Sequence, residues 1–175
     1  MKPFPTRLPA IALALALLTG CAAQKQAAKA NAQDQAAAFL QAEKALADRR
    51  FIIELNTVYT PEGNRIDIQN SSLTMRDSRA EVDLSPELFR KKPHRRLSDL
   101  QITDKKANLQ PKERKKNGDT VYELSVSDRE ATWKRDYLFS ITLFADSDAC
   151  LIQVRHLLSN TEECKIRGTV RPLLP

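Results

Sequence analysis

The chain has 175 residues, of which 42% are hydrophobic, 29% charged and 6% aromatic, and its formal net charge is +6. This length and composition indicate one globular domain and exclude collagen-like sequence and wholesale disorder. The four glycines lie far apart, so the chain has no glycine-rich phosphate-binding loop, and most classes of nucleotide enzyme are disfavoured.

Residues 1–20 have the pattern of a signal peptide. Residues 1–8 carry Lys2 and Arg7 and no acid, and they precede an apolar stretch at residues 9–18, which is far shorter than the ~20 residues that a membrane-spanning helix needs. The next residues, Leu18-Thr19-Gly20-Cys21, resemble the lipobox of bacterial lipoproteins. The resemblance implies cleavage before Cys21 and acyl chains on this cysteine, which would anchor the protein in a membrane. The alternative is an ordinary secretory signal followed by a cysteine by chance.

The residue after Cys21 is Ala22 rather than an aspartate. By resemblance to the sorting rules of Gram-negative envelopes, this implies the outer membrane, in the leaflet that faces the periplasm. Residues 21–35 are mostly Ala, Gln and Lys and present no apolar face. We therefore expect a lipidated polar tether at residues 21–35 and a single domain at residues 36–175.

The domain begins with an expected helix. Ala36, Phe39, Ala42 and Leu46 are spaced three and four residues apart, which predicts an amphipathic helix that runs to Arg50. Beyond it the apolar residues alternate with polar ones, which predicts β-strands. The expected inward residues, strand by strand, are Phe51, Ile53 and Leu55; Ile66 and Ile68; Leu73 and Met75; Val82 and Leu84; Tyr122, Leu124 and Val126; Tyr137, Phe139, Ile141 and Leu143; Cys150, Ile152 and Val154; and Cys164, Ile166 and Val170.

Turn-forming residues separate these strands. Asn117-Gly118, between strand-like runs at 108–115 and 120–127, is the strongest hairpin signal in the chain. Other turns are expected at residues 61–64, 70–71, 145–148 and 159–162, and a charged connection at 86–106. The predicted fold class is α+β and mainly β, with the N-terminal amphipathic helix packed on an antiparallel curved sheet or a flattened barrel of several short strands.

From about residue 40 to 170 the chain resembles an uncharacterised family of small bacterial envelope lipoproteins built on a domain of unknown function. The resemblance rests on Arg49-Arg50 before Phe51-Ile52-Ile53-Glu54, on Ser85-Pro86-Glu87-Leu88-Phe89, on the Asn-Gly hairpin, on the strands from Tyr137 to Phe144 and from Cys150 to Val154, and on Ile166-Arg167-Gly168. It implies this fold and a place in the cell envelope, and it implies no activity.

Two cysteines follow Cys21. In an oxidising compartment, a disulfide between Cys150 and Cys164 is one interpretation. If the intervening turn is centred near residues 160–161, however, Cys164 faces Leu157 and Cys150 faces Arg171, so the two are about 20 Å apart, well beyond the ~7 Å that a disulfide allows between Cα atoms. We therefore favour buried free thiols over a disulfide.

No motif assigns a catalytic residue, a cofactor or a metal. A zinc site from His156, Cys164 and Glu163 is conceivable, but the chain lacks the usual ligand spacing. His94 lies among arginines and has no carboxylate near it in sequence to orient it. Hydrolase motifs are absent, although paired carboxylates could still meet in the folded chain.

Positive charge is concentrated between Arg90 and Lys116, where the sequence contains eleven Lys or Arg residues and three Asp or Glu residues. The candidate anionic-ligand patch is Arg90, Lys91, Lys92, Arg95 and Arg96, with an anionic lipid or an acidic envelope protein as its partner. The alternative is a solvated loop followed by a hairpin whose lysines block strand-to-strand aggregation. Nucleic acid is disfavoured as a partner, because the few aromatic residues belong to expected core strands and supply no stacking surface.

These observations lead to two hypotheses of different classes. The favoured one is a noncatalytic, lipid-anchored binding or scaffold module of the outer membrane that faces the periplasm. The alternative is a periplasmic carboxylate-dependent hydrolase that acts on cell-envelope material, with its acids on the concave face of the sheet. The oligomeric state and the ligand do not follow from the sequence.

Overall fold

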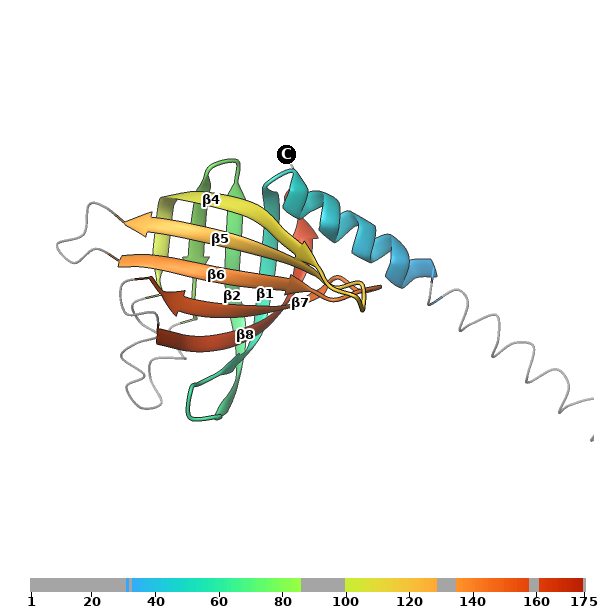
Figure 1. Cartoon of the computed structure of the whole chain (residues 1–175). Helices are drawn as coiled ribbons and strands as arrows, with labels where there is room; N and C mark the ends of the chain where they lie inside the picture. The colour runs from blue at the N-terminus through green and yellow to red at the C-terminus, as the bar shows by residue number, and fades with distance from the viewer. Residues whose placement is uncertain (1–30, 32, 86–99, 129–134, 158–160, 175) are drawn as a thin grey trace, which may run out of the picture.

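The computed structural model describes residues 31, 33–85, 100–128, 135–157 and 161–174. Eight antiparallel strands form a closed barrel in which each strand pairs with the next along the chain and the last returns to the first (Figure 1). The strands are β1 (Arg50–Tyr59), β2 (Arg65–Arg76), β3 (Arg79–Asp83), β4 (Ile102–Arg114), β5 (Thr120–Asp128), β6 (Arg135–Leu143), β7 (Ala149–His156) and β8 (Thr161–Pro172).

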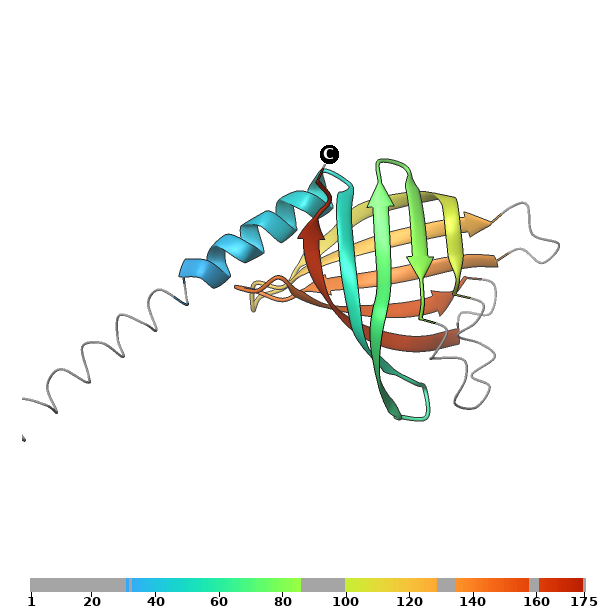
Figure 2. The same cartoon turned by 180° about the vertical axis from the view of Figure 1, so that it is seen from behind.

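Closure of the barrel decides between the two predicted architectures. The mainly β prediction with a helix is confirmed, but the sheet is a closed barrel rather than a curved sheet with free ends. The seam joins β1 to β8 in antiparallel register from Phe51 opposite Pro172 to Tyr59 opposite Lys165 (Figure 2). Closure provides hydrogen-bonding partners for the backbone N–H and C=O groups of β1 and β8 that an open sheet would leave unpaired at its two edges.

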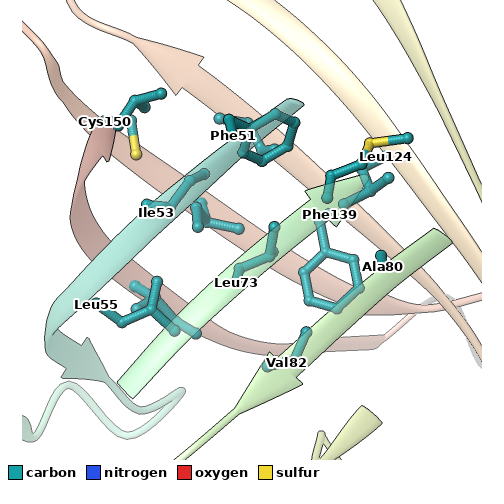
Figure 3. Packing of buried hydrophobic residues seen from close by; sticks show 14 of the residues in the cluster. Phe51, Ile53, Leu55, Leu73, Ala80, Val82, Leu124, Phe139 and Cys150 are labelled. Carbon is teal, nitrogen blue, oxygen red and sulfur yellow. The ribbon is translucent and has the colours of Figure 1, made fainter. Parts of the chain in front are cut away.

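Alternation along the strands fills the interior of the barrel with apolar side chains. In β3, and in β7 from Cys150 to Val154, every second residue is buried, as the period of two predicts. Side chains from opposite walls meet in the middle, among them Phe51, Ile53, Leu73, Leu124 and Phe139 (Figure 3). An eight-stranded barrel is just wide enough for side chains to fill it. The interior of this barrel is therefore a hydrophobic core.

A glycine permits the close approach of β1 and β8 at the seam. Gly168 lies opposite Leu55 in the register. A Cβ atom added at this glycine would lie 2.6 Å from Cγ2 of Ile53 and 2.8 Å from the backbone oxygen of Glu54. Real Cβ atoms essentially never come that close to another heavy atom. The close approach of β1 and β8 at the seam therefore requires a residue without a side chain at position 168.

The predicted helix is present at residues 33–47 and slants across the end of the barrel where β1 begins (Figures 1 and 2). Phe39, Ala42 and Leu46 are buried in the same hydrophobic cluster as the barrel interior, together with Ala45, whereas Ala36 is exposed. The helix ends before the expected Arg50, because Arg49 adopts a left-handed backbone (φ 57) and the chain turns into β1.

Side chains of β4 and β5 hold the helix in place from one side. The Arg114 guanidinium lies 5.9 Å from the centre of the Phe39 ring and 3.8 Å from the Glu43 carboxylate. The Thr120 hydroxyl donates a hydrogen bond of 3.4 Å to the same carboxylate. These contacts hold the helix over this end of the barrel, so the helix covers the end.

Two predicted boundaries were wrong. At Asn70-Ser71 the alternation of inward and outward residues shifts by one position, but the chain does not turn there, because β2 continues through these residues. Leu55 pairs with Ser71 and Thr57 pairs with Asp67, so residues 68–70 of β2 lie opposite the single residue Asn56 of β1. This β-bulge, with Asn70 in the left-handed region (φ 51), changes which residues face inward without reversing the chain. The reversal comes at Asp77 (φ 56) instead. The expected charged connection is also shorter, because β4 already begins at Ile102.

Candidate functional site

The interior of the barrel offers no polar site among the described residues. Among the residues whose side chains the structure describes, the buried polar side chains are Thr57, Thr60, Ser71 and Thr120, and no Asp, Glu, Lys or Arg is buried. The hydrolase hypothesis needs two carboxylates on the concave face, and the side chains that the structure describes supply none there. A binding site for a polar ligand would therefore lie on the outside of the barrel.

A hollow of about 220 Å³ lies on the outer wall formed by β4, β5, β6 and β7, the wall that faces the viewer in Figure 1. We call it the outer-wall groove. It is lined by Lys112, Glu113, Lys115, Val121, Glu123, Leu138, Ser140, Thr142, Gln153 and Arg155.

Strand register explains how these residues come together. Glu123 of β5 lies opposite Ser140 of β6, which lies opposite Gln153 of β7, so these three side chains form one row across the wall. Val121 and Thr142 form a second row, and Leu138 and Arg155 a third. The residues between the rows, such as Leu124 and Phe139, point into the core. The period of two that builds the core thus also builds the groove.

The charges of the groove are only partly neutralised. The Lys112 ammonium forms a salt bridge with the Glu123 carboxylate. Within the described part of the chain, neither Lys115 nor Arg155 forms a salt bridge, and the side chains of Ser140, Thr142 and Gln153 form no hydrogen bond. Groups of this kind remain available to a bound ligand.

Near one end of the groove, the hairpin tips of β4–β5 and β6–β7 are joined by Asp119. The backbone amide of Ala145 donates a hydrogen bond of 2.9 Å to the Asp119 carboxylate. This bond is the main reason that the pKa of Asp119 is lowered, and the positive charge of Lys115 contributes a smaller part. The joined tips fix the end of the groove at which Lys115 lies.

Comparison with known proteins places this barrel in a family. The family model described as "Domain of unknown function (DUF4251)" matches residues 33–170. The chain belongs to the DUF4251 family. This agrees with the expected resemblance to a family built on a domain of unknown function, and the family's description carries no activity.

Another DUF4251 domain has the same fold. The crystal structure of a DUF4251 family protein from Bacteroides eggerthii DSM 20697 is similar to this chain with a TM-score of 0.62 and 14% sequence identity, over 81% of this chain and 91% of that one. None of the curated proteins compared with this DUF4251 chain matches it. Within the described residues, every helix is too short or too polar to cross a membrane.

Several predicted site residues lie outside the described part of this DUF4251 chain. These are Cys21, His94 and the candidate patch Arg90, Lys91, Lys92, Arg95 and Arg96. Three of the remaining basic residues of the run from Arg90 to Lys116 have different surroundings. Arg114 packs against the helix, whereas Lys112 and Lys115 line the groove.

The two cysteines are buried thiols, as predicted. Their predicted register was wrong: Cys150 lies opposite Gly168, not Arg171, and Cys164 lies opposite Val154, not Leu157. The separation along β8 is then four residues, about 13 Å, which still excludes a disulfide. Burial raises the pKa of the Cys150 thiol to about 12.

The zinc hypothesis gains no support from the described residues. The His156 ring packs edge-on against the Tyr137 ring, with 5.4 Å between the ring centres. Cys164 is buried in the hydrophobic cluster. In the described ranges, no three His, Cys, Asp or Glu side chains lie close enough together to hold a metal ion.

The groove is not predictable from the sequence alone. Its residues come from four strands, and no local motif marks them. The available signal was the outward-facing set of each strand, which the period of two identifies, but the order of the strands in the barrel was needed to bring Glu123, Ser140 and Gln153 together.

Proposed function

We propose that this DUF4251 protein is a noncatalytic, lipid-anchored module of the outer membrane that faces the periplasm and binds a ligand in the outer-wall groove. The lipobox-like sequence that ends at Cys21 supports the anchor. One structural observation carries the binding role. The barrel interior is filled with apolar side chains, whereas the outer wall has a groove in which Lys115, Arg155 and three polar side chains have no salt-bridge or hydrogen-bond partner among the described residues.

The basic residues Arg90, Lys91, Lys92, Arg95 and Arg96 belong to the same proposal. A domain held close to a membrane by acyl chains on Cys21 would meet anionic lipid headgroups at the surface. Each basic residue near such a surface contributes on the order of 1 kcal/mol to the attraction, and salt weakens it. These residues would orient the module, and the groove would bind the ligand.

The proposal is tested by photocrosslinking in intact cells, combined with metabolic labelling by a tagged fatty acid. A photoreactive residue is placed at Ser140 in the groove or, as the matched control, at Glu81, an exposed position of β3 outside the groove. We expect fatty-acid label on the protein and a crosslinked product that forms from position 140 and not from position 81. The absence of a product from position 140, or the same product from both, contradicts the binding role.

The hydrolase alternative rests on one observation. Glu113 and Glu123 both line the groove, so two carboxylates share one surface. Glu123 is already paired with Lys112. Release of products from cell-envelope material by the purified protein would favour this alternative.

A further inference from the structure

We infer that the outer-wall groove binds an acidic saccharide, a chain of at least two linked sugars that carries carboxylate groups. The inference rests on the proposed function, because it names the ligand of the same groove. It follows from three features: the uncharged polar groups at the centre, the apolar side chains beside them, and the position of the cations.

The centre of the groove matches the hydroxyl groups of a sugar. Ser140, Thr142 and Gln153 are half-buried, and each can both donate and accept hydrogen bonds. Their side chains have no hydrogen-bond partner within the described residues. A ligand recognised by charge alone would need no such groups, whereas a polyol offers a donor and an acceptor at each hydroxyl.

Apolar side chains lie next to these polar groups. Val121 lies one row from Glu123 on one side of the polar centre, and Leu138 lies one row away on the other side. Leu138 is half-buried and supplies most of the accessible apolar surface, whereas Val121 is 5% exposed. A sugar ring has C–H groups on its faces that pack on apolar surface while its hydroxyls form hydrogen bonds at the rim. Sites for small ligands combine apolar lining with a few placed polar groups in this way.

The cations define the length of the ligand. Lys115 lies on the β4 side, beyond the row of Val121, and Arg155 lies on β7 in the row of Leu138. Neighbouring strands are about 4.8 Å apart, so three spacings, about 14 Å, separate β4 from β7. The row of Arg155 is also four residues along β6 from the row of Val121, about 13 Å, so one sugar ring does not span the two cations, whereas two or more linked rings can. The planar Arg155 guanidinium suits a carboxylate, which it can bind through two parallel hydrogen bonds.

The total charge favours a ligand of modest charge density. Three cations, Lys112, Lys115 and Arg155, line the groove together with Glu113 and Glu123. A densely phosphorylated ligand would meet both carboxylates, whereas a sugar chain with spaced carboxylates meets the cations at the ends. A peptide is disfavoured because the groove lies on the face of paired strands, where the backbone groups already bind each other and cannot recognise a peptide backbone.

The test uses the full-length protein in detergent micelles and isothermal titration calorimetry at low salt. The probe is tetragalacturonate, a chain of four acidic sugars. The comparison ligands are maltotetraose, which has four neutral sugars, galacturonate monomer, and a tetraglutamate peptide. We expect tetragalacturonate to bind at least about tenfold more tightly than each of the other three, since one charge-assisted hydrogen bond corresponds to about that factor.

Variants show whether the groove is the binding site. Arg155→Gln and Lys115→Gln each remove one cation that forms no salt bridge within the described residues, and we expect each to weaken tetragalacturonate binding about tenfold. The matched control is Lys106→Gln, at an exposed position of β4 outside the groove, which should leave binding unchanged. Thermal unfolding of each variant confirms that the barrel is intact.

The outcomes separate the inference from the proposed function. No tetragalacturonate binding, equal binding of maltotetraose, or tighter binding of tetraglutamate would overturn the saccharide inference, and a product from position 140 would still support the binding role. Equal weakening by the Lys106 variant would also overturn the inference. Cleavage of tetragalacturonate would support the saccharide class and overturn the noncatalytic function instead.

Discussion

Replacement of Gly168 by alanine tests closure of the barrel, because the sign of its effect depends on the seam. A Cβ at this position would lie 2.6 Å from the Ile53 side chain and 2.8 Å from the Glu54 backbone oxygen. Insertion of one carbon into a packed interior costs about 1–3 kcal/mol, and the backbone contact, which cannot rotate away, places this site toward the upper end. The alanine also reduces the conformational entropy of the unfolded chain, which raises the free energy of unfolding by about 0.4–1 kcal/mol.

The expected net effect of Gly168→Ala is a loss of about 2 kcal/mol in the free energy of unfolding. For a chain of this size, that corresponds to a decrease in Tm of about 4–8 °C, measured by circular dichroism. If β1 and β8 were free edges of an open sheet, the added Cβ would meet neither the Ile53 side chain nor the Glu54 backbone, and the restriction of the unfolded chain would then favour the folded protein. An unchanged or increased Tm therefore refutes the seam.

A second glycine serves as the control for this experiment. Gly63, in the turn between β1 and β2, has φ of +84 and no atom within 4 Å of an added Cβ. Gly63→Ala should cost about 1–2 kcal/mol through backbone strain alone, whether the barrel is closed or open. A decrease in Tm for Gly63→Ala without one for Gly168→Ala would show that the assay is sensitive and that the seam is wrong.

Three further predictions concern the thiols, the anchor and the helix. Cys150 should not react with iodoacetamide in the folded protein at pH 8, which is four units below its pKa of about 12, and it should react in denaturant. Above about pH 9 the unfolded thiol loses its proton while the folded thiol keeps it, so the free energy of unfolding should fall as the pH rises. Cys21→Ser should abolish fatty-acid labelling in cells and leave an uncleaved precursor, since the thiol is the acyl acceptor; label on the variant would contradict the anchor. Phe39→Ala should lower the free energy of unfolding by about 3 kcal/mol in a denaturant titration, whereas Leu40→Ala, at an exposed position of the same helix, should change it by less than about 0.5 kcal/mol.

The elements that the sequence predicts well are those with local signals. The spacing of Phe39, Ala42 and Leu46 predicts the helix, and the alternation from Tyr137 to Leu143 predicts β6. Gly118 adopts the positive φ of 92 that an Asn-Gly hairpin requires. In each case, neighbouring residues along the chain carry the information, so no knowledge of distant contacts is needed.

Closure and the bulge at Asn70 depend on distant contacts instead. Nothing near Phe51 or Gly168 in the sequence indicates that β1 and β8 pair, because the partners are separated by more than a hundred residues. At Asn70 the parity of the inward residues changes, and parity alone cannot distinguish a bulge from a turn. The pairing of β1 with both sides of the change decides in favour of the bulge.

The same limit explains why the candidate site was not found from the sequence. The run of basic residues after Arg90 is conspicuous in the sequence, but in the structure Lys112 pairs with Glu123 and Arg114 packs on Phe39. The groove combines these strands with Gln153 and Arg155, which carry no local signal. Charge density along the chain therefore differs from charge density in space.

The fold separates residues that stabilise the barrel from residues that are available for recognition. The inward positions of each strand, such as Ile53, Phe139 and Ile152, are apolar and fill the interior, and a barrel of this kind needs only the pattern and the volume to be kept. The relative from Bacteroides eggerthii has the same fold at 14% identity, which is what such a requirement permits. Outward positions such as Ser140 and Arg155 do not fill the core, so two members of the family can share the barrel and differ in what their outer walls bind. A ligand identified for one member therefore transfers to another only if the groove residues transfer with it.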